Sequence, residues 1–435
     1  MSADILDSAE GMDQAAVRHL PIRRAVPPTW WTRPHVFVGF FLLPLAVLII
    51  VMADRVIRNN AAGYKSADFI TPFYSLLFLL ALGLIAFWAF VASRQRFWLP
   101  QVEFKNGVFD FLFYFVLAAY LIWFVPLAVM DSGSLLGALI GQAGAVYRIR
   151  ELGLNIPGVT TVTQFGIAYA CIYGTKVFTH KQKINARYHV YMVAIVLLAI
   201  FRAVVNSERI AVLEIVIPLV VICGRNLGGR SKLFATIVSS FPLLTIFGAP
   251  IFFAAFEYNR SWVIYYQFIY DNIFEFAFER LSIYYVSSLN NICGLLDVQS
   301  WPTYTGDWTL RWLYRFPIVG DTLSALLSSG QTEAFQRFLE NNSDVEFNNT
   351  TGILVVFQDW GMLGAAVFFS VYGWIAGYGY RAFVRARGLA QYIYPVVFYS
   401  LYEVLRIGYI YDGRCFSALV GFFIAYVFWG RRTRR

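Results

Sequence analysis

The stretch that decides the fold is 108–130, VFDFLFYFVLAAYLIWFVPLAVM, an apolar run that holds one charged side chain, Asp110. About 20 apolar residues in a helix cross the roughly 30 Å hydrocarbon layer of a bilayer. In lipid every backbone polar group must find its partner within the protein, so a segment of this length predicts a helix. The chain therefore reads as a membrane protein.

The rest of the chain agrees with this reading, because 59% of its 435 residues are hydrophobic and only 14% are charged. Soluble domains carry about 25% charged residues. We predict an all-α polytopic membrane protein with ten transmembrane helices, seven of them within 36–256 and three within 351–430. The predicted spans are 36–53, 72–92, 108–130, 159–178, 188–204, 210–223, 233–256, 351–380, 391–410 and 414–430.

The distribution of positive charge predicts the orientation of these spans. One alternate set of segments holds 21 of the 35 Lys and Arg residues, although it leaves out the longest connection. These segments are the arm 1–35, 93–107, 176–187, 224–232, 381–387 and the tail 431–435. The positive-inside rule places them in the cytoplasm, which gives an N-in, C-in protein. The net charge of +9 is explained by this bias and does not indicate a nucleic-acid partner. The arm lacks the apolar region and cleavage site of a signal peptide, so we expect it to be retained.

The connection 257–350 then lies on the periplasmic side, and it is far longer than the other connections. A long structured loop among short ones usually carries function. Its first part, 262–285, predicts one or two aromatic helices at the membrane surface or over a cavity. Turn residues alternate with aromatic residues over 301–321, and a short polar helix is expected within 331–348.

The loop offers no metal chemistry, and we predict neither a metal site nor another cofactor. The four histidines, His19, His35, His180 and His189, all lie outside 257–359. The four cysteines form no CxxC pair, so a zinc or iron–sulfur site is not expected. The sequence leaves open whether Cys293 and Cys415 pair.

Several arginines lie on the predicted outer side, next to or between the predicted spans. Arginine binds phosphate oxygens through a planar fork and stays charged when partly buried, so a cluster beside lipid suits a lipid-linked pyrophosphate. The plainer alternative is that these arginines pair with acids or reach out to headgroups. Arg311 and Arg315 share one helix face and form either a phosphate clamp or a basic surface helix on anionic lipid. The pyrophosphate-binding candidates are Arg202, Arg209, Arg280, Arg311, Arg315 and Arg406.

Two carboxylates are the candidates for a catalytic base. Asp359 precedes Trp360 and Gly361 where the eighth span begins, and Glu257 begins the long loop. A carboxylate at the rim of a cavity can deprotonate a hydroxyl. The alternative for Asp359 is an acid in the first turn of a helix, which the helix dipole favours. Glu275 and Glu279 are further candidates with equally plain structural alternatives.

Two stretches give the chain a resemblance to a known family. RAVVNSERIAVLEI, 202–215, is similar to an arginine-bearing turn between two spans, and FQDWGMLGAAVFFSVYGWIAGYGYR, 357–381, is similar to the start of a span after a large loop. In both, and in the order of its features, the chain resembles the Wzy-type polymerases of O-antigen and capsule repeat units. The family's periplasmic pair of Arg and Gly has no clear counterpart here.

The resemblance implies a metal-independent glycosyltransferase of the bacterial inner membrane with its active site facing the periplasm. It would transfer a growing polysaccharide from undecaprenyl diphosphate to the next lipid-linked repeat unit. By position, Arg202 and Arg209 match the arginine-bearing turn and Asp359 matches the acid after the loop. The implied partners are the lipid-linked donor and acceptor, membrane lipids and a chain-length regulator, with no nucleic acid.

Three rival functions stay open from the sequence. An O-antigen ligase uses a similar fold and donor but is expected to carry a histidine in the large loop, which this chain lacks. A transporter or flippase of lipid-linked oligosaccharide would favour two related halves and binding groups at mid-membrane. A structural subunit of an export machine has no need of charges within the spans.

Overall fold

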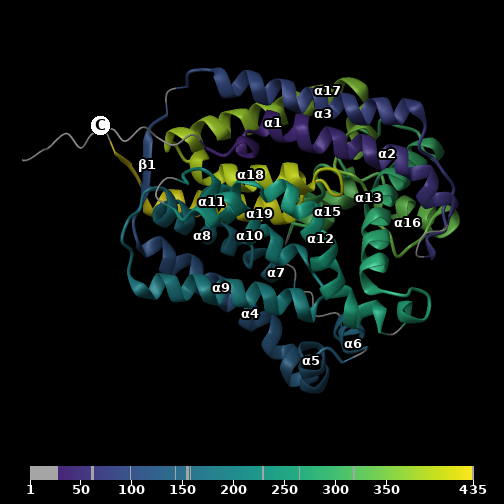
Figure 1. Ribbon diagram of the computed structural model, residues 1–435, viewed down its shortest axis with the longest axis horizontal. Helices are drawn as coiled ribbons and strands as arrows, with labels where there is room; N and C mark the ends of the chain where they lie inside the picture. The colour runs from purple at the N-terminus through teal and green to yellow at the C-terminus, as the bar shows by residue number, and fades with distance from the viewer. Residues whose placement is uncertain are drawn as a thin grey trace, which may run out of the picture.

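The computed structural model describes residues 28–59, 63–97, 99–142, 144–152, 156, 158–227, 230–263, 265–316 and 319–433 (Figure 1). These residues are mostly α-helical, which confirms the predicted all-α fold class. One antiparallel pair of short strands, β1 (Gln101–Phe104) and β2 (Gly430–Thr433), is the only sheet among them.

Among the described residues, five helices are long and apolar enough to cross a membrane. Four are α3 (Pro72–Arg94), α4 (Gly107–Met130), α9 (Ala186–Val205) and α17 (Leu354–Arg385). The fifth, Pro34–Arg58, combines α1 (Pro34–Phe37), the π-helix η2 (Val38–Leu42) and α2 (Leu43–Arg58).

A sixth candidate span is a bent pair, α11 (Lys232–Ser239) and α12 (Phe241–Glu257), which meet at 77°. The described residues therefore support a multi-pass membrane protein, whereas the ten spans and their N-in, C-in orientation stay predictions.

The other predicted spans are shorter or interrupted. The run at 159–178 folds as α7 (Val159–Val162), the fully buried α8 (Phe165–Gly174) and the π-helix η4 (Thr175–Thr179). The run at 391–410 forms α18 (Ala390–Glu403), after which the chain turns and Arg406 pairs with Glu403. The remaining short elements are η1 (Trp30–Thr32), α5 (Ser132–Leu139), α6 (Ala145–Glu151), α10 (Ile210–Gly224), η7 (Tyr409–Tyr411) and α19 (Gly413–Trp429).

Small residues set the closest helix contact, that of α3 with α17. Gly373 and Gly377 are one turn apart and meet the backbone of Ile85 and Ala89, where a Cβ atom on either glycine would collide with a carbonyl oxygen. Close approach through small residues is how helices pack in lipid, where neighbouring tails are as apolar as leucine.

The connections predicted to be cytoplasmic gather at one end of the molecule. There β1 pairs with β2, Gly388 N–H donates to Pro100 O at 2.8 Å, and Thr29 N–H donates to Gly224 O at 2.9 Å. Figure 1 shows β1 at this end and α13 and α16 at the other. These contacts join described parts of several connections that the charge pattern assigns to the cytoplasm, and the orientation itself stays a prediction.

The long loop folds as a helical unit at the opposite end. It comprises η5 (Tyr258–Trp262), η6 (Tyr266–Phe268), α13 (Ile273–Val298), α14 (Arg311–Tyr314), α15 (Gly320–Leu327) and α16 (Gln331–Asn342). The aromatic helix expected over 262–285 begins later, because the Asn272 side chain caps α13 by accepting from Glu275 N–H at 2.8 Å. The short polar helix within 331–348 is confirmed as α16. Cys293 and Cys415 are both buried and free, so they do not pair in this structure.

Candidate functional site

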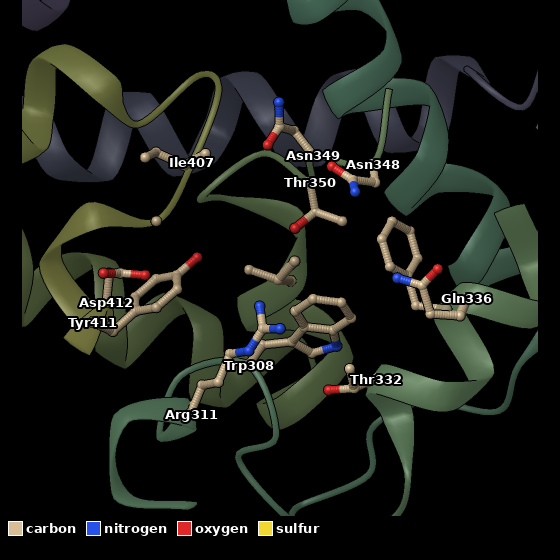
Figure 2. A pocket seen from close by; sticks show the side chains of 13 residues that line it. Trp308, Arg311, Thr332, Gln336, Asn348, Asn349, Thr350, Ile407, Tyr411 and Asp412 are labelled. Carbon is tan, nitrogen blue, oxygen red and sulfur yellow. The ribbon is translucent and has the colours of Figure 1, made fainter. Parts of the chain in front are cut away.

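A cavity of ≈ 300 Å³ opens where the long loop meets the turn before α19 (Figure 2). Its walls come from the segment leading into α14, from α16, from the residues before α17 and from the turn before α19. They are Trp308, Arg311, Thr332, Phe335, Gln336, Asn348, Asn349, Thr350, Val355, Ile407, Gly408, Tyr411 and Asp412.

Arg311 is the cation of this cavity, and Figure 2 shows its guanidinium pointing inward beside Trp308. Among the described residues it makes no ion pair, and its Nε atom has no hydrogen-bond partner. Burial lowers the pKa of Arg311 to about 10, the neighbouring charge of Arg315 adds to this, and the carboxylate of Asp412 opposes it. The side chain is therefore still cationic at neutral pH, and it faces the cavity without an ion-pair contact to any described residue, although Asp412 lines the same cavity.

The other walls carry the groups that a sugar-binding site needs. Trp308 and Tyr411 supply aromatic rings, which combine an apolar face with a polar edge. Asn348, Asn349 and Gln336 supply amides that donate and accept hydrogen bonds. A few convergent polar groups among aromatic side chains are typical of small-molecule sites.

Asp412 brings a carboxylate to the same cavity, and the sequence analysis did not single it out. It is the N-cap of α19, where its side chain accepts from Arg414 N–H at 2.9 Å. The only sequence signal is its place in YDGR between two predicted spans, and that pattern is also typical of a plain helix cap.

Asp359 lies beside the cavity but does not face it, because it is fully buried. Its carboxylate accepts hydrogen bonds from the Thr309 N–H and hydroxyl, both at 2.8 Å, and from Trp308 N–H at 3.2 Å. It is neither an N-cap nor a rim residue, since α17 begins five residues earlier at Leu354. The geometry gives Asp359 the role of an anchor for the segment that carries Trp308.

A kink in α17 completes this anchor. Gly361 has φ 66°, in the left-handed region that favours glycine, and it breaks the helix just after Asp359. The loop forms two backbone hydrogen bonds at this kink: Thr303 N–H donates to Gln358 O at 3.0 Å, and Tyr304 N–H donates to Asp359 O at 2.8 Å. Backbone and side-chain bonds therefore hold 303–309 against the start of α17.

Glu257 lies in a buried cluster with two of the predicted arginines. Its carboxylate lies 3.2 Å from Arg209 Nη2 and 3.5 Å from Arg280 Nε, and it accepts from Ser261 Oγ at 2.6 Å. Arg280 also pairs with Glu346 and donates to the Tyr266 hydroxyl at 2.9 Å. Both Glu257 and Arg280 are fully buried, and this cluster ties the loop to the spans.

Arg202 belongs to a second cluster, in which the number of positive side chains again equals the number of negative ones. It pairs with Glu208 at 2.6 Å and donates to Thr163 Oγ1 at 2.8 Å. Arg414 pairs with Glu208 at 2.7 Å and with Glu214 at 3.3 Å, which gives the buried Glu214 its partner. Two arginines thus face two glutamates.

The last two predicted arginines differ from each other. Arg406 pairs with Glu403 at 2.8 Å. Arg315 is exposed one turn from Arg311 and makes no ion pair within the part of the chain that the structure describes. The structure therefore splits the six predicted arginines: Arg202, Arg209, Arg280 and Arg406 have carboxylate partners, and Arg311 and Arg315 have none among the described residues.

No group of three His, Cys, Asp or Glu within the described ranges is placed to hold a metal ion. Comparison of the chain with protein-family models, with curated proteins and with solved structures finds no match in any of the three.

Proposed function

We propose that this protein is a polysaccharide polymerase that transfers a growing glycan from its undecaprenyl-diphosphate carrier to the next lipid-linked repeat unit. In this proposal the cavity beside Arg311 binds the diphosphate and the first sugars. The multi-pass fold supports it, because a lipid-linked substrate must be met at the membrane. Its place is the bacterial inner membrane, with the cavity facing the periplasm.

One observation carries the proposal, namely a cavity cation that makes no ion pair among the described residues. Four of the six candidate arginines already neutralise carboxylates. Arg311 is left to bind an anion, and the surrounding rings and amides suit the sugars attached to that anion. A diphosphate held there would leave the anomeric carbon near Asp412.

The roles follow from the chemistry of glycosyl transfer. An acceptor hydroxyl oxygen forms the new bond to the anomeric carbon while the bond from that carbon to the diphosphate oxygen breaks. The leaving diphosphate keeps the bonding electron pair, and Arg311 stabilises its charge. Asp412 takes the proton of the hydroxyl as general base. Because Asp359 and Glu257 are fully engaged, we assign them to holding the loop.

The test is complementation of a strain that lacks this gene, read as the ladder of surface polysaccharide on a gel. We expect wild type to restore the ladder and Arg311→Gln to leave single repeats, because the leaving group loses its cation. Arg337→Gln, an exposed arginine of the same loop, is the matched control and is expected to restore the ladder. An unchanged ladder in the strain without the gene would refute the polymerase.

A second pair of variants separates the two roles open to Asp412. Asparagine caps a helix about as well as aspartate but cannot accept a proton at neutral pH. If Asp412 is the base, Asp412→Asn lowers the transfer rate by about 10²–10⁴-fold in protein that still folds. If it only caps α19, Asp412→Asn keeps the ladder while Asp412→Ala weakens the helix.

One observation favours a transporter, the second candidate. The α11–α12 pair is bent by 77°, and broken helices are frequent in transporters. The same strain decides between the two. A transporter defect would trap lipid-linked repeats on the cytoplasmic side, whereas a polymerase defect leaves them exposed on the periplasmic side.

A further inference from the structure

A second group of basic side chains lies at the end of the molecule opposite the cavity. It consists of Lys176 in η4, His180 directly after η4 and Arg225 at the end of α10. Lys176 and Arg225 keep only 5% and 7% of their surface exposed. The Gln391 side chain of α18 adjoins His180, so three helical segments meet here.

Lys176 and Arg225 both lie close enough to His180 for their charges to act on it. Burial and the charges of Arg225 and Lys176 lower the pKa of His180, against the opposing effects of Glu103 and Gln391, so the ring is neutral at pH 7. Glu103 of β1 is the acidic group that acts on both Lys176 and His180. Within the described ranges, however, none of the three basic side chains makes an ion pair.

Neutral hydrogen-bond acceptors satisfy only some of the polar atoms of these three side chains. Lys176 Nζ donates to Asn106 Oδ1 at 2.8 Å, and Arg225 Nη2 reaches Val384 O only at 3.4 Å. Arg225 Nη1 and His180 Nε2 are buried and have no hydrogen-bond partner in the described part of the chain. A buried guanidinium without a carboxylate is costly, since removing one partner of a buried ion pair costs about 3–5 kcal/mol.

We propose that Arg225, Lys176 and His180 form a binding site for a phosphate group, separate from the cavity at the other end. Arg225 supplies a planar fork of donors, Lys176 supplies a point charge and His180 supplies a ring N–H, which together suit phosphate oxygens. The π-helix η4 places Lys176 and His180, and single-turn π-helices are frequent at functional sites.

Two sources can supply that phosphate group, a phospholipid headgroup or free phosphate. The exposed residues Lys181, Lys183, Arg230 and Lys232 surround the site in sequence and favour any anion that approaches. The site lies among the connections that the charge pattern places at the cytoplasmic membrane surface. This proposal does not depend on the polymerase.

The experiment measures thermal unfolding of the purified protein with two probes. One arm compares nanodiscs of phosphatidylcholine with nanodiscs that contain phosphatidylglycerol. The other arm adds inorganic phosphate in detergent and uses chloride at equal ionic strength as reference. We expect a saturating ligand to raise the Tm of wild type by about 5 °C.

The outcomes separate the sources and can overturn the site. A rise with phosphatidylglycerol alone identifies a lipid headgroup, and a rise with both probes identifies the phosphate group itself. Arg225→Gln is expected to lose the rise, while the control Arg337→Gln, an exposed arginine of α16 at the opposite end of the molecule, keeps it. Lys176→Met serves the same purpose if Arg225→Gln does not fold. No rise with either probe, or an equal rise in wild type and both buried-site variants, overturns the proposal.

Discussion

Two regions on the loop side of this protein contain arginine, and they differ in how the charge is balanced. In the buried clusters, Arg202 and Arg414 face Glu208 and Glu214, and Arg209 and Arg280 face Glu257 and Glu346. In the cavity, Arg311 has no carboxylate partner within the described ranges. Arginine beside a membrane is therefore not enough to mark a ligand site, because the site is where the chain leaves the charge unbalanced.

The difference has an energetic cause. A charge removed from water loses several kcal/mol of hydration, which only close opposite charges and hydrogen bonds restore. The clusters meet that requirement within the chain and are expected to be rigid. Arg311 in the cavity makes no such ion pair among the described residues, and the proposed function leaves this requirement to a bound anion.

The largest effect is expected from breaking a buried cluster. Arg280→Met leaves Glu257 with one cation fewer in a fully buried place, and we expect the protein to lose about 3–5 kcal/mol of stability. The measurement is thermal unfolding in detergent, followed by the yield of folded protein on size-exclusion chromatography.

Two further variants make this result specific. Arg280→Met combined with Glu257→Gln should recover part of the loss, since the orphaned carboxylate is gone. Arg58→Gln breaks a pair whose side chains are 78% and 55% exposed, and it should cost at most about 1 kcal/mol. Equal losses of stability in Arg280→Met and Arg58→Gln would contradict the distinction between buried and solvent-exposed ion pairs.

The next effect comes from adding a further carboxylate to the cavity on the side formed by α16. Thr332 lines the cavity in the first turn of α16, where a helix tolerates a negative charge well. We expect Thr332→Asp to keep stability but to lower polymer formation about tenfold or more, because the new carboxylate competes with the substrate anion for Arg311. Thr332→Asn has nearly the same shape without the charge and should keep near wild-type activity, measured by the same ladder. Equal activity of the two variants would show that no anion binds near Arg311.

A smaller effect, with a defined pH dependence, is expected at Glu208. Burial alone would raise the pKa of Glu208, but Arg414 and Arg202 outweigh it and hold the pKa below its usual value of 4.5. The charged form therefore stabilises the folded state above that value, and the contribution is lost as the pH falls through the folded-state pKa. Glu208→Gln should cost about 1–3 kcal/mol at pH 7. The difference in the free energy of unfolding between Glu208→Gln and wild type, measured from pH 7 to pH 3, should become smaller only below about pH 4.5. A difference that is constant over this range would mean that the ion pairs do not carry the effect.

The sequence predicted the long uninterrupted helices well, for a clear reason. The predicted spans at 72–92, 108–130 and 188–204 lie within α3, α4 and α9, because their apolar runs decide both helix and burial. Prediction was poorer where backbone geometry intervenes. The run after 390 contains Glu403, Arg406 and Gly408, and the structure ends α18 at Glu403.

The candidate site was only partly predictable from the sequence. Arg311 could be named as a possible clamp from its spacing to Arg315. The sequence could not show which arginines pair with carboxylates, because the partners meet only after folding. Glu346 is 66 residues from Arg280 along the chain, and Glu208 is 206 residues from Arg414. Asp412 was missed for the same reason, since only the folded chain brings the turn before α19 to the cavity.

Arg315 should give the smallest effect and the finest test of the comparison between the two regions. It lacks an ion pair in the described structure, as Arg311 does, but it is exposed to solvent. Salt screens exposed charges over about 8–10 Å, so Arg315 can attract a substrate anion only weakly and from outside the cavity. We expect Arg315→Gln to lower activity by about fivefold or less, and only at low ionic strength, because one exposed charge is worth at most about 1 kcal/mol. The Arg311→Gln defect should persist at high salt, since that guanidinium is partly buried. If the two variants are equally damaging at every salt concentration, both arginines contact the anion, and burial does not separate the binding residue from its neighbour.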